Sequence, residues 1–205
     1  MARKDVASIV SGAGWTADFM GQLINGLLAK GHAPEEIHSL VTAKQRPAMD
    51  KIVEEVSSFL RELGNIFSLT LNYYLPLAEA IVAGKYDGVN DDITEDHFPK
   101  IHTGAAELEA QLVHFNRPIE SDEVLKELDK AGLRAGTLSE LLAFGAKYPE
   151  KQREFSIIAL GSVWQSRRGF RHVPALWSYS SERDLRLYWC GRRWRESYRF
   201  LAFHK

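Results

Sequence analysis

The stretch that decides the fold is Arg183-Asp-Leu-Arg-Leu-Tyr-Trp189, near the carboxyl end of the chain. Apolar side chains occupy every second position of it, and successive side chains of a β-strand point to opposite faces. The pattern therefore predicts a strand with one face toward the core and the other toward water. The predicted core face carries Leu185, Leu187 and Trp189, and the predicted water face carries Asp184, Arg186 and Tyr188.

Alternation also marks the strands on either side of this stretch. Tyr198, Phe200 and Ala202 alternate with Arg199, Leu201 and Phe203, which predicts a terminal strand that is buried on both faces. Upstream, residues 66–72 and 108–116 alternate in the same way, and the apolar run 155–164 predicts a further strand. We expect the first and last strands of this domain to pair.

Helices are predicted between these strands. Residues 76–83 form a short helix that ends at Gly84, and Ser121 is the expected N-cap of a second helix. Thr137-Leu-Ser-Glu140 has the spacing of a capping box, in which a Thr side chain and a Glu side chain each bond to the other's backbone N–H. This box opens a third helix that ends before Pro149.

The first part of the chain has helical periodicity only, with apolar residues such as Leu23, Leu27 and Ile52 on helical spacing. Pro34 and Pro47 are placed to open its second and third helices. The sequence thus predicts an α+β protein, with an N-terminal helical unit at 1–62 and a second domain at 63–205.

Composition narrows the class of protein. The chain has 205 residues, 45% of them hydrophobic, and no apolar run of the roughly 18 residues that cross a bilayer. No signal-peptide core is seen, and the single Cys190 cannot form an internal disulfide or a cysteine zinc cage. We therefore expect a cytoplasmic protein that does not insert into a membrane.

Charge is distributed unevenly along the chain. Residues 165–205 hold ten Lys and Arg against three Asp and Glu, a net charge of +7, whereas the other 164 residues hold 16 against 24, a net charge of −8. The basic tail is compatible with an acidic partner such as nucleic acid, but also with neutralisation by the acidic body.

Two sets of residues are interleaved in the tail. The first set is apolar or conformationally special and has the character of a framework: Trp164, Gly169, Val173, Pro174, Leu176, Trp194, Phe200 and Leu201. The second set is rich in Tyr, Trp, Arg and Ser, the composition of antibody-like binding surfaces. It consists of Arg167, Arg168, Phe170, His172, Trp177, Ser178, Tyr179, Ser180, Ser181, Asp184, Arg186, Tyr188, Arg192, Arg193, Arg195, Ser197 and Tyr198.

The run from Leu112 to the C-terminus resembles the variable proteins of diversity-generating retroelements, which have a C-type-lectin-like fold. The motifs that carry the resemblance are 132–140 (GLRAGTLSE), 160–164 (LGSVW), 171–174 (RHVP), 183–189 (RDLRLYW) and 198–202 (YRFLA). In that family, error-prone reverse transcription at template adenines rewrites codons near the end of the gene. The resemblance implies that residues 164–199 form a hypervariable face on a lectin-like domain, and that the second set above binds a protein or cell-surface ligand.

The chain also departs from relatives of that fold. It lacks the Glu-Pro-Asn and Trp-Asn-Asp tripeptides that hold calcium and sugar in true C-type lectins. It also lacks the cysteine pair of the formylglycine-generating enzymes, because Cys190 is alone. We expect no metal and no cofactor.

Catalysis is not predicted. Ser162 lacks the G-x-S-x-G context of a nucleophile elbow. His114, His172 and His204 could lie close together in the fold, but nothing in their spacing indicates it. The acidic segment 85–100 does not match a calcium loop. The main alternative function is nucleic-acid binding, in which the arginines of the tail contact phosphate and its aromatic rings stack on bases.

Overall fold

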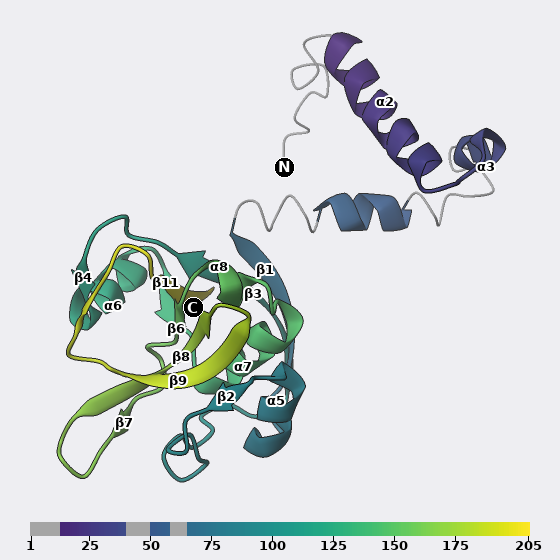
Figure 1. The fold of residues 1–205 in the computed structure, drawn as a ribbon. Helices are drawn as coiled ribbons and strands as arrows, with labels where there is room; N and C mark the ends of the chain where they lie inside the picture. Colours follow the sequence, from purple (N-terminus) through teal and green to yellow (C-terminus); the bar gives the residue numbers. More distant parts are fainter. Residues whose placement is uncertain (1–12, 40–49, 58–64) are drawn as a thin grey trace. The chain divides into compact units, whose positions relative to one another are not determined.

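The computed structural model describes residues 13–39, 50–57 and 65–205, and the chain divides into two compact units, Met1–Ser57 and Ser58–Lys205. The first unit contains helix α2 (Ala13–Ala29) and helix α3 (Pro34–Ser39), and residues 50–57 are also helical (Figure 1). Pro34 opens α3 as predicted. Both ends of the helix predicted from Pro47 lie outside the described residues.

The second unit is a mixed α+β domain, which confirms the predicted class. Its main sheet has the strand order β1-β3-β11-β6-β8-β9-β2, with β5 also paired to β11 and β7 to β8, and β10 pairs separately with β4. The elements are β1 (Ile66–Asn72), α5 (Leu77–Gly84), β2 (Gly88–Val89), β3 (Ala105–Val113), β4 (Ile119–Glu120), α6 (Ser121–Lys130), β5 (Leu133–Ala135), α7 (Leu138–Lys147), α8 (Lys151–Glu154), β6 (Ile157–Ile158), β7 (Trp164–Gln165), β8 (Arg171–Tyr179), β9 (Glu182–Trp189), β10 (Arg193–Trp194) and β11 (Arg199–His204).

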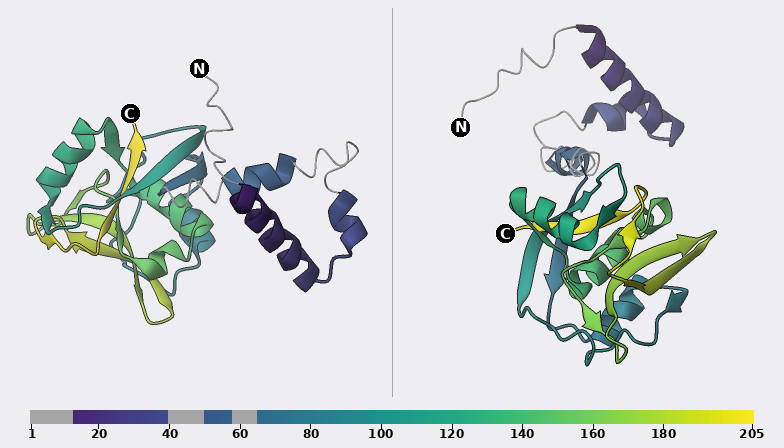
Figure 2. Two further views of the ribbon diagram at one scale, coloured as in Figure 1. Left: turned by 90° about the horizontal axis from the view of Figure 1, so that it is seen from above. Right: turned by 90° about the vertical axis from the view of Figure 1, so that its left-hand side faces the viewer.

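Strand β11 separates two hydrophobic clusters. Leu201 and Phe203 belong to one cluster, and their neighbours Phe200 and Ala202 belong to the other. Because these pairs alternate along one strand, the clusters lie on opposite faces of the sheet. The terminal strand is therefore buried on both faces, as its sequence predicts. Helix α7 supplies buried leucines to the first cluster and α6 supplies Val124 and Leu128 to the second. The course of the two helices beside the sheet can be followed in Figures 1 and 2.

The predicted capping box at the start of α7 is confirmed. Thr137 accepts a hydrogen bond from the Glu140 N–H, and the Glu140 carboxylate accepts from the Thr137 N–H at 2.7 Å. That carboxylate is fully buried and also accepts from Arg134 at 2.7 Å and from the Tyr73 hydroxyl at 2.9 Å. Burial opposes its ionisation, but these hydrogen bonds outweigh burial and hold the pKa of Glu140 below its usual value. Ser162 adds a further contact, because its hydroxyl accepts from the Leu138 N–H.

Three predictions about the fold are wrong. The first and last strands of the domain do not pair, because β3 lies between β1 and β11 and pairs with both. The apolar run 155–164 is not one strand, because it contains only the short strand β6 and the first residue of β7. Between them the chain turns at Gly161, which lies against the backbone of Gly136. Ser121 makes no cap hydrogen bond and instead bonds to Cys190 and Trp194.

Helix α5 matches its predicted range within one residue at each end. Strand β3 begins and ends three residues before the predicted range 108–116. In the described part of the chain, no helix is both long and apolar enough to cross a bilayer.

Candidate surface for ligand binding

Strands β8 and β9 form a long antiparallel hairpin near the edge of the main sheet. In its register Trp177 pairs with Asp184, Ala175 with Arg186, and Val173 with Tyr188. Directly paired residues point to the same face, so the odd-numbered residues of β8 share a face with the even-numbered residues of β9. The turn between the strands contains Ser180 with φ at 56°, in the left-handed region.

At the turn end of this face, aromatic rings and an arginine form a stack. The rings of Trp177 and Tyr179 are parallel within 4°, with their centroids 6.0 Å apart. The guanidinium carbon of Arg186 lies 3.7 Å from the centre of the Trp177 ring, and its Nη2 is 2.6 Å from an oxygen of Asp184. Arg186 is therefore held between an aromatic face and a carboxylate, which fixes the direction of its remaining N–H groups.

At the other end of the face, Arg192 lies over three aromatic rings. Its guanidinium carbon is 4.9 Å from the ring centre of Tyr188, 5.4 Å from that of Tyr198 and 5.5 Å from that of Trp194. Burial raises the pKa of Tyr188, with a smaller contribution from Tyr198, while the neighbouring arginines 192 and 186 act in the opposite direction. Arg186 and Tyr188 are two positions apart on β9 and therefore point to the same side of the hairpin, which joins the two ends of the face.

We call this set the arginine–aromatic face. It consists of Trp177, Tyr179, Arg186, Tyr188, Arg192 and Tyr198, and all six belong to the set predicted from sequence to bind a ligand. Tyr179 is 70% exposed and Arg186 is exposed, whereas the other four are half-buried.

Trp194 supports this face from below. Its ring is fully buried against Tyr188, Tyr198 and Phe200. Its indole N–H donates to the hydroxyl of Ser121 at 2.8 Å, and that hydroxyl donates to the carbonyl of Cys190 at 2.6 Å. Ser121 on α6 thus positions the segment that carries Arg192.

Asp184 is placed differently from the sequence prediction. It was expected on the water face, but it is only 8% exposed. The physical reason is β2, which pairs in parallel with β9 and brings Gly88 against the Asp184 side chain. Asp184 therefore lies beneath Arg186 as its partner rather than on the surface.

The opposite face of the hairpin corrects a second prediction. Leu185 is fully buried and Leu187 is half-buried, but Trp189 is 49% exposed although it was predicted to lie in the core. Its ring meets that of Phe170 edge to face at 6.1 Å. The first hydrophobic cluster includes Leu185 and Leu187 but does not reach Trp189. Alternation therefore still sets the direction of this side chain but does not determine its burial.

The remaining predicted residues lie around the face rather than on it. Phe170 and His172 point to the opposite face, with His172 beside Trp164 and its buried Nδ1 without a partner among the described residues. Arg167 and Arg168 are exposed between β7 and β8. The Ser178 hydroxyl donates to the carbonyl of Gln152. The other predicted residues are exposed, near the hairpin turn or around β10: Ser180, Ser181, Arg193, Arg195 and Ser197.

Most of the predicted framework is buried. Val173, Pro174, Leu176, Trp194, Phe200 and Leu201 are all inside the domain. Trp164 is half-buried, and Gly169 is exposed in the turn before β8 with φ at 84°. The framework and the second set thus differ in burial at most positions, with Asp184 as the clear exception.

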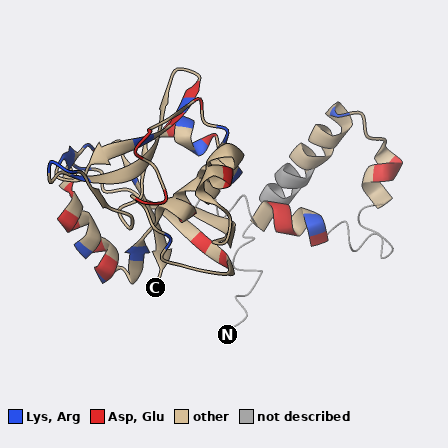
Figure 3. Ribbon diagram, turned by 90° about the horizontal axis from the view of Figure 1, so that it is seen from below, with Lys and Arg blue, Asp and Glu red and all other residues tan. Residues whose placement is uncertain are grey.

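The two arginines of the arginine–aromatic face differ in whether a carboxylate balances their charge. Arg186 is paired with Asp184, whereas Arg192 has no carboxylate within 4.0 Å among the described residues. Arg193 pairs in register with Glu120 across β10 and β4. Helix α6 carries both signs of charge, with Asp122 and Glu123 in its first turn and Lys130 in its last. Figure 3 shows basic and acidic residues on many elements of the second unit.

Sequence reasoning missed one group of side chains close to this surface. His97 stacks on Trp164 at 4.3 Å, and both border a hollow that includes Asp92, Arg167 and Arg168. His97 comes from the acidic segment 85–100. Because it is 67 positions from Trp164 in the sequence, no local spacing could have indicated the contact.

The described residues contain no group of three or more His, Cys, Asp or Glu arranged to hold a metal ion. The three histidines considered for catalysis have separate surroundings. His114 bonds to the carbonyl of Glu196 at 2.6 Å, and His204 bonds to the Gln111 side chain at 3.0 Å.

The chain was compared with family models, with curated proteins and with solved structures, and none of these comparisons produced a match.

Proposed function

We propose that this protein binds a ligand through the arginine–aromatic face, and that the ligand is a protein, such as one displayed on a cell surface. The observation that carries the proposal is the continuity of six side chains, all of residue types enriched at protein interfaces, on one side of the β8–β9 hairpin. Binding, rather than catalysis, is the activity assigned to the domain.

The physical basis is preorganisation. Arg186 and Arg192 are held against aromatic rings before any ligand arrives. Less side-chain freedom is then lost on binding, and the cost of association is lower. Interfaces concentrate their binding energy in such tyrosine, tryptophan and arginine anchors.

The contacts that Trp177 and Arg186 already make favour a protein ligand over nucleic acid. One face of Trp177 is occupied by Arg186, and the charge of Arg186 is balanced by Asp184. Base stacking needs free ring faces, and phosphate contact is favoured by unpaired cations. Arg192 alone on this face has an uncompensated charge among the described residues.

We also propose that the domain is C-type-lectin-like and belongs to the variable proteins of diversity-generating retroelements. The α+β class, the buried framework and the surface position of most residues of the second set support this assignment. In this proposal, retroelement mutagenesis rewrites positions around 164–199 while the framework stays constant.

The binding proposal is tested with a matched pair of double variants. Tyr179→Ala with Arg192→Ala removes the most exposed ring and the uncompensated arginine of the face. Tyr74→Ala with Arg117→Ala makes the same chemical changes at exposed positions outside it. Both variants and the wild type are screened against a panel of purified cell-surface ectodomains.

Ectodomains that bind the wild type should bind the first variant at least about 100-fold more weakly, since truncation of each anchor costs about 2 kcal/mol. They should bind the control variant unchanged. Equal loss in both variants contradicts the proposal. A single-stranded DNA arm is included: tight binding that weakens with a slope of about −0.7 per phosphate contact would assign nucleic acid instead.

The retroelement assignment has a separate test. The DNA around the gene is sequenced and searched for a near-copy of the segment encoding residues 164–199 beside a reverse-transcriptase gene. A copy that differs mainly at adenines supports the assignment, and a complete locus without one removes it.

A further inference from the structure

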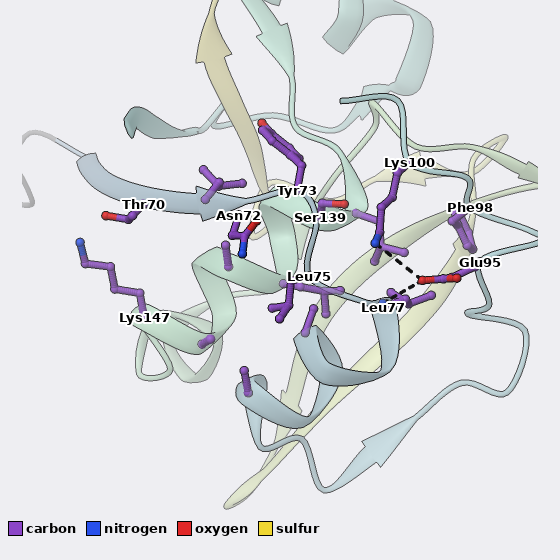
Figure 4. Close-up of a pocket in the computed structure, with 17 residues that line it drawn as sticks. Thr70, Asn72, Tyr73, Leu75, Leu77, Glu95, Phe98, Lys100, Ser139 and Lys147 are labelled. Carbon is purple, nitrogen blue, oxygen red and sulfur yellow. Dashed lines mark hydrogen bonds and ion pairs between the residues drawn. The ribbon is translucent and has the colours of Figure 1, made fainter. Parts of the chain in front are cut away.

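A pocket of about 400 Å³ lies between α5, α7, the end of β1 and the segment 95–100 (Figure 4). We call it the α5–α7 pocket. Its lining shares no residue with the arginine–aromatic face.

The pocket is hollow because small side chains meet where the two helices face each other. Ala80 and Ala83 come from α5, and Ala143 and Ala146 come from α7. Protein interiors normally leave few voids larger than a water molecule. A hollow of this volume falls instead in the range of small-molecule sites, which starts at about 300 Å³.

The wall of the pocket is apolar and fixed in place. Leu71, Leu138 and Leu142 are buried members of the larger core cluster, and Phe98 is buried beside them. Such a wall gains free energy when it covers apolar surface of a ligand, at about 25 cal/mol per Å². At about 30 Å³ for each non-hydrogen atom, a value taken from liquid water, the volume accommodates about a dozen such atoms.

Three charged residues line the pocket, and their sum is +1. Lys100 and Glu95 lie on one side, whereas Lys147 lies on the opposite side near Thr70 (Figure 4). Glu95 is already engaged, since it accepts from the Leu77 N–H at 3.0 Å and its carboxylate is 3.7 Å from the Lys100 ammonium. Lys147 donates to the carbonyl of Ser68.

The geometry points to a medium-chain carboxylate as the ligand of the α5–α7 pocket, with about ten carbons along the alanines and the carboxylate at Lys100. An amphiphile of this kind matches both the apolar wall and the positive sum of the lining. A cationic head group at this end would meet the ammonium of Lys100, next to a Glu95 carboxylate that is already engaged. A small dianion would leave the apolar wall uncovered.

The test uses the full chain and three probes with ten-carbon chains. The two ionic probes are kept below their micelle concentrations, and the alcohol is kept below its solubility limit. Decanoate, decanol and decyltrimethylammonium are titrated by isothermal calorimetry. Decanoate should bind about fivefold more tightly than decanol, because Lys100 is partly exposed and its contribution is screened. The cation should bind more weakly than decanol. Absence of decanoate binding at millimolar concentration overturns the proposal.

Variants locate the binding. Ala80→Leu fills the pocket and should abolish decanoate binding, whereas Ala78→Leu places the same side chain on the exposed side of the same helix and should leave binding unchanged. Retention of binding in a folded Ala80→Leu protein overturns the site. Lys100→Met, at a partly exposed position, should bring decanoate to the affinity of decanol, and an unchanged ratio overturns the assignment of the head group. This second variant keeps the test decisive if Ala80→Leu fails to fold.

Discussion

Replacement of Ser121 by Ala tests how the arginine–aromatic face is supported. The Ser121 hydroxyl accepts from the indole N–H of Trp194 at 2.8 Å and donates to the carbonyl of Cys190 at 2.6 Å. Both bonds are buried, and both tie α6 to the segment before and within β10. The variant removes one oxygen atom and with it two hydrogen bonds.

The magnitude follows from what is left without a partner. The indole N–H lies in a fully buried ring and has no other hydrogen-bond partner among the described residues. A buried donor or acceptor that loses its partner costs about 1–3 kcal/mol, so the two together are expected to cost about 2–4 kcal/mol. If Ser121 were only the helix N-cap predicted from sequence, the loss would be about 1 kcal/mol.

The measurement is equilibrium unfolding in urea, monitored by tryptophan fluorescence and circular dichroism. Ser197→Ala is the control, because Ser197 is exposed and only its backbone carbonyl is engaged. The control should differ from the wild type by less than about 0.5 kcal/mol. A cost of about 1 kcal/mol or less for Ser121→Ala would refute the role of this hydroxyl in holding Trp194.

Two further predictions concern the interior of the domain. Glu140→Gln should lower stability at pH 7 by about 3–5 kcal/mol, because it leaves Arg134 without its anionic partner. The pKa of Glu140 is lower in the folded state than in the unfolded state. The stabilisation by its carboxylate is therefore present above the unfolded-state pKa and is lost as pH falls through the folded-state pKa. Urea midpoints should consequently fall less in the variant than in the wild type between about pH 5 and pH 2. Leu185→Ala should lower the stability by about 2–5 kcal/mol, because this side chain is fully buried. Trp189→Ala should cost only about 1–2 kcal/mol, because half of the tryptophan side chain already meets water. The reverse order in thermal unfolding would contradict the burial described for β9.

Much of the fold could be predicted from local patterns. Alternation in residues 66–72 and 183–189 gives strands because a half-buried strand repeats every two residues. The capping box at Thr137 was predictable because all its partners lie within one helical turn. The direction of each side chain along β9 was predictable from the same two-residue repeat.

What could not be predicted depends on contacts between distant segments. Asp184 is buried because β2 from the acidic segment 85–100 covers that edge of β9. Trp189 is exposed because the first hydrophobic cluster, contributed largely by distant segments, does not reach it. The pairing of β3 with β11 places β3 inside the sheet, and no periodicity within either strand specifies its neighbour.

The same distinction applies to the candidate site. The residue types of the arginine–aromatic face were visible in the sequence, but the separation of Phe170 and His172 onto the opposite face requires the register of β8 with β9. The α5–α7 pocket could not be predicted, because it needs the relative placement of two helices that are more than fifty residues apart.

The central claim is that the arginine–aromatic face can change while the framework beneath it cannot. The most direct measurement is a display experiment with two libraries, one randomising Tyr179, Arg186, Arg192 and Tyr198, the other randomising Val173, Leu176, Leu185 and Phe200. The fraction of clones that resist a fixed protease challenge is counted in each. The account predicts that most clones of the first library and few of the second survive, and equal survival would contradict it.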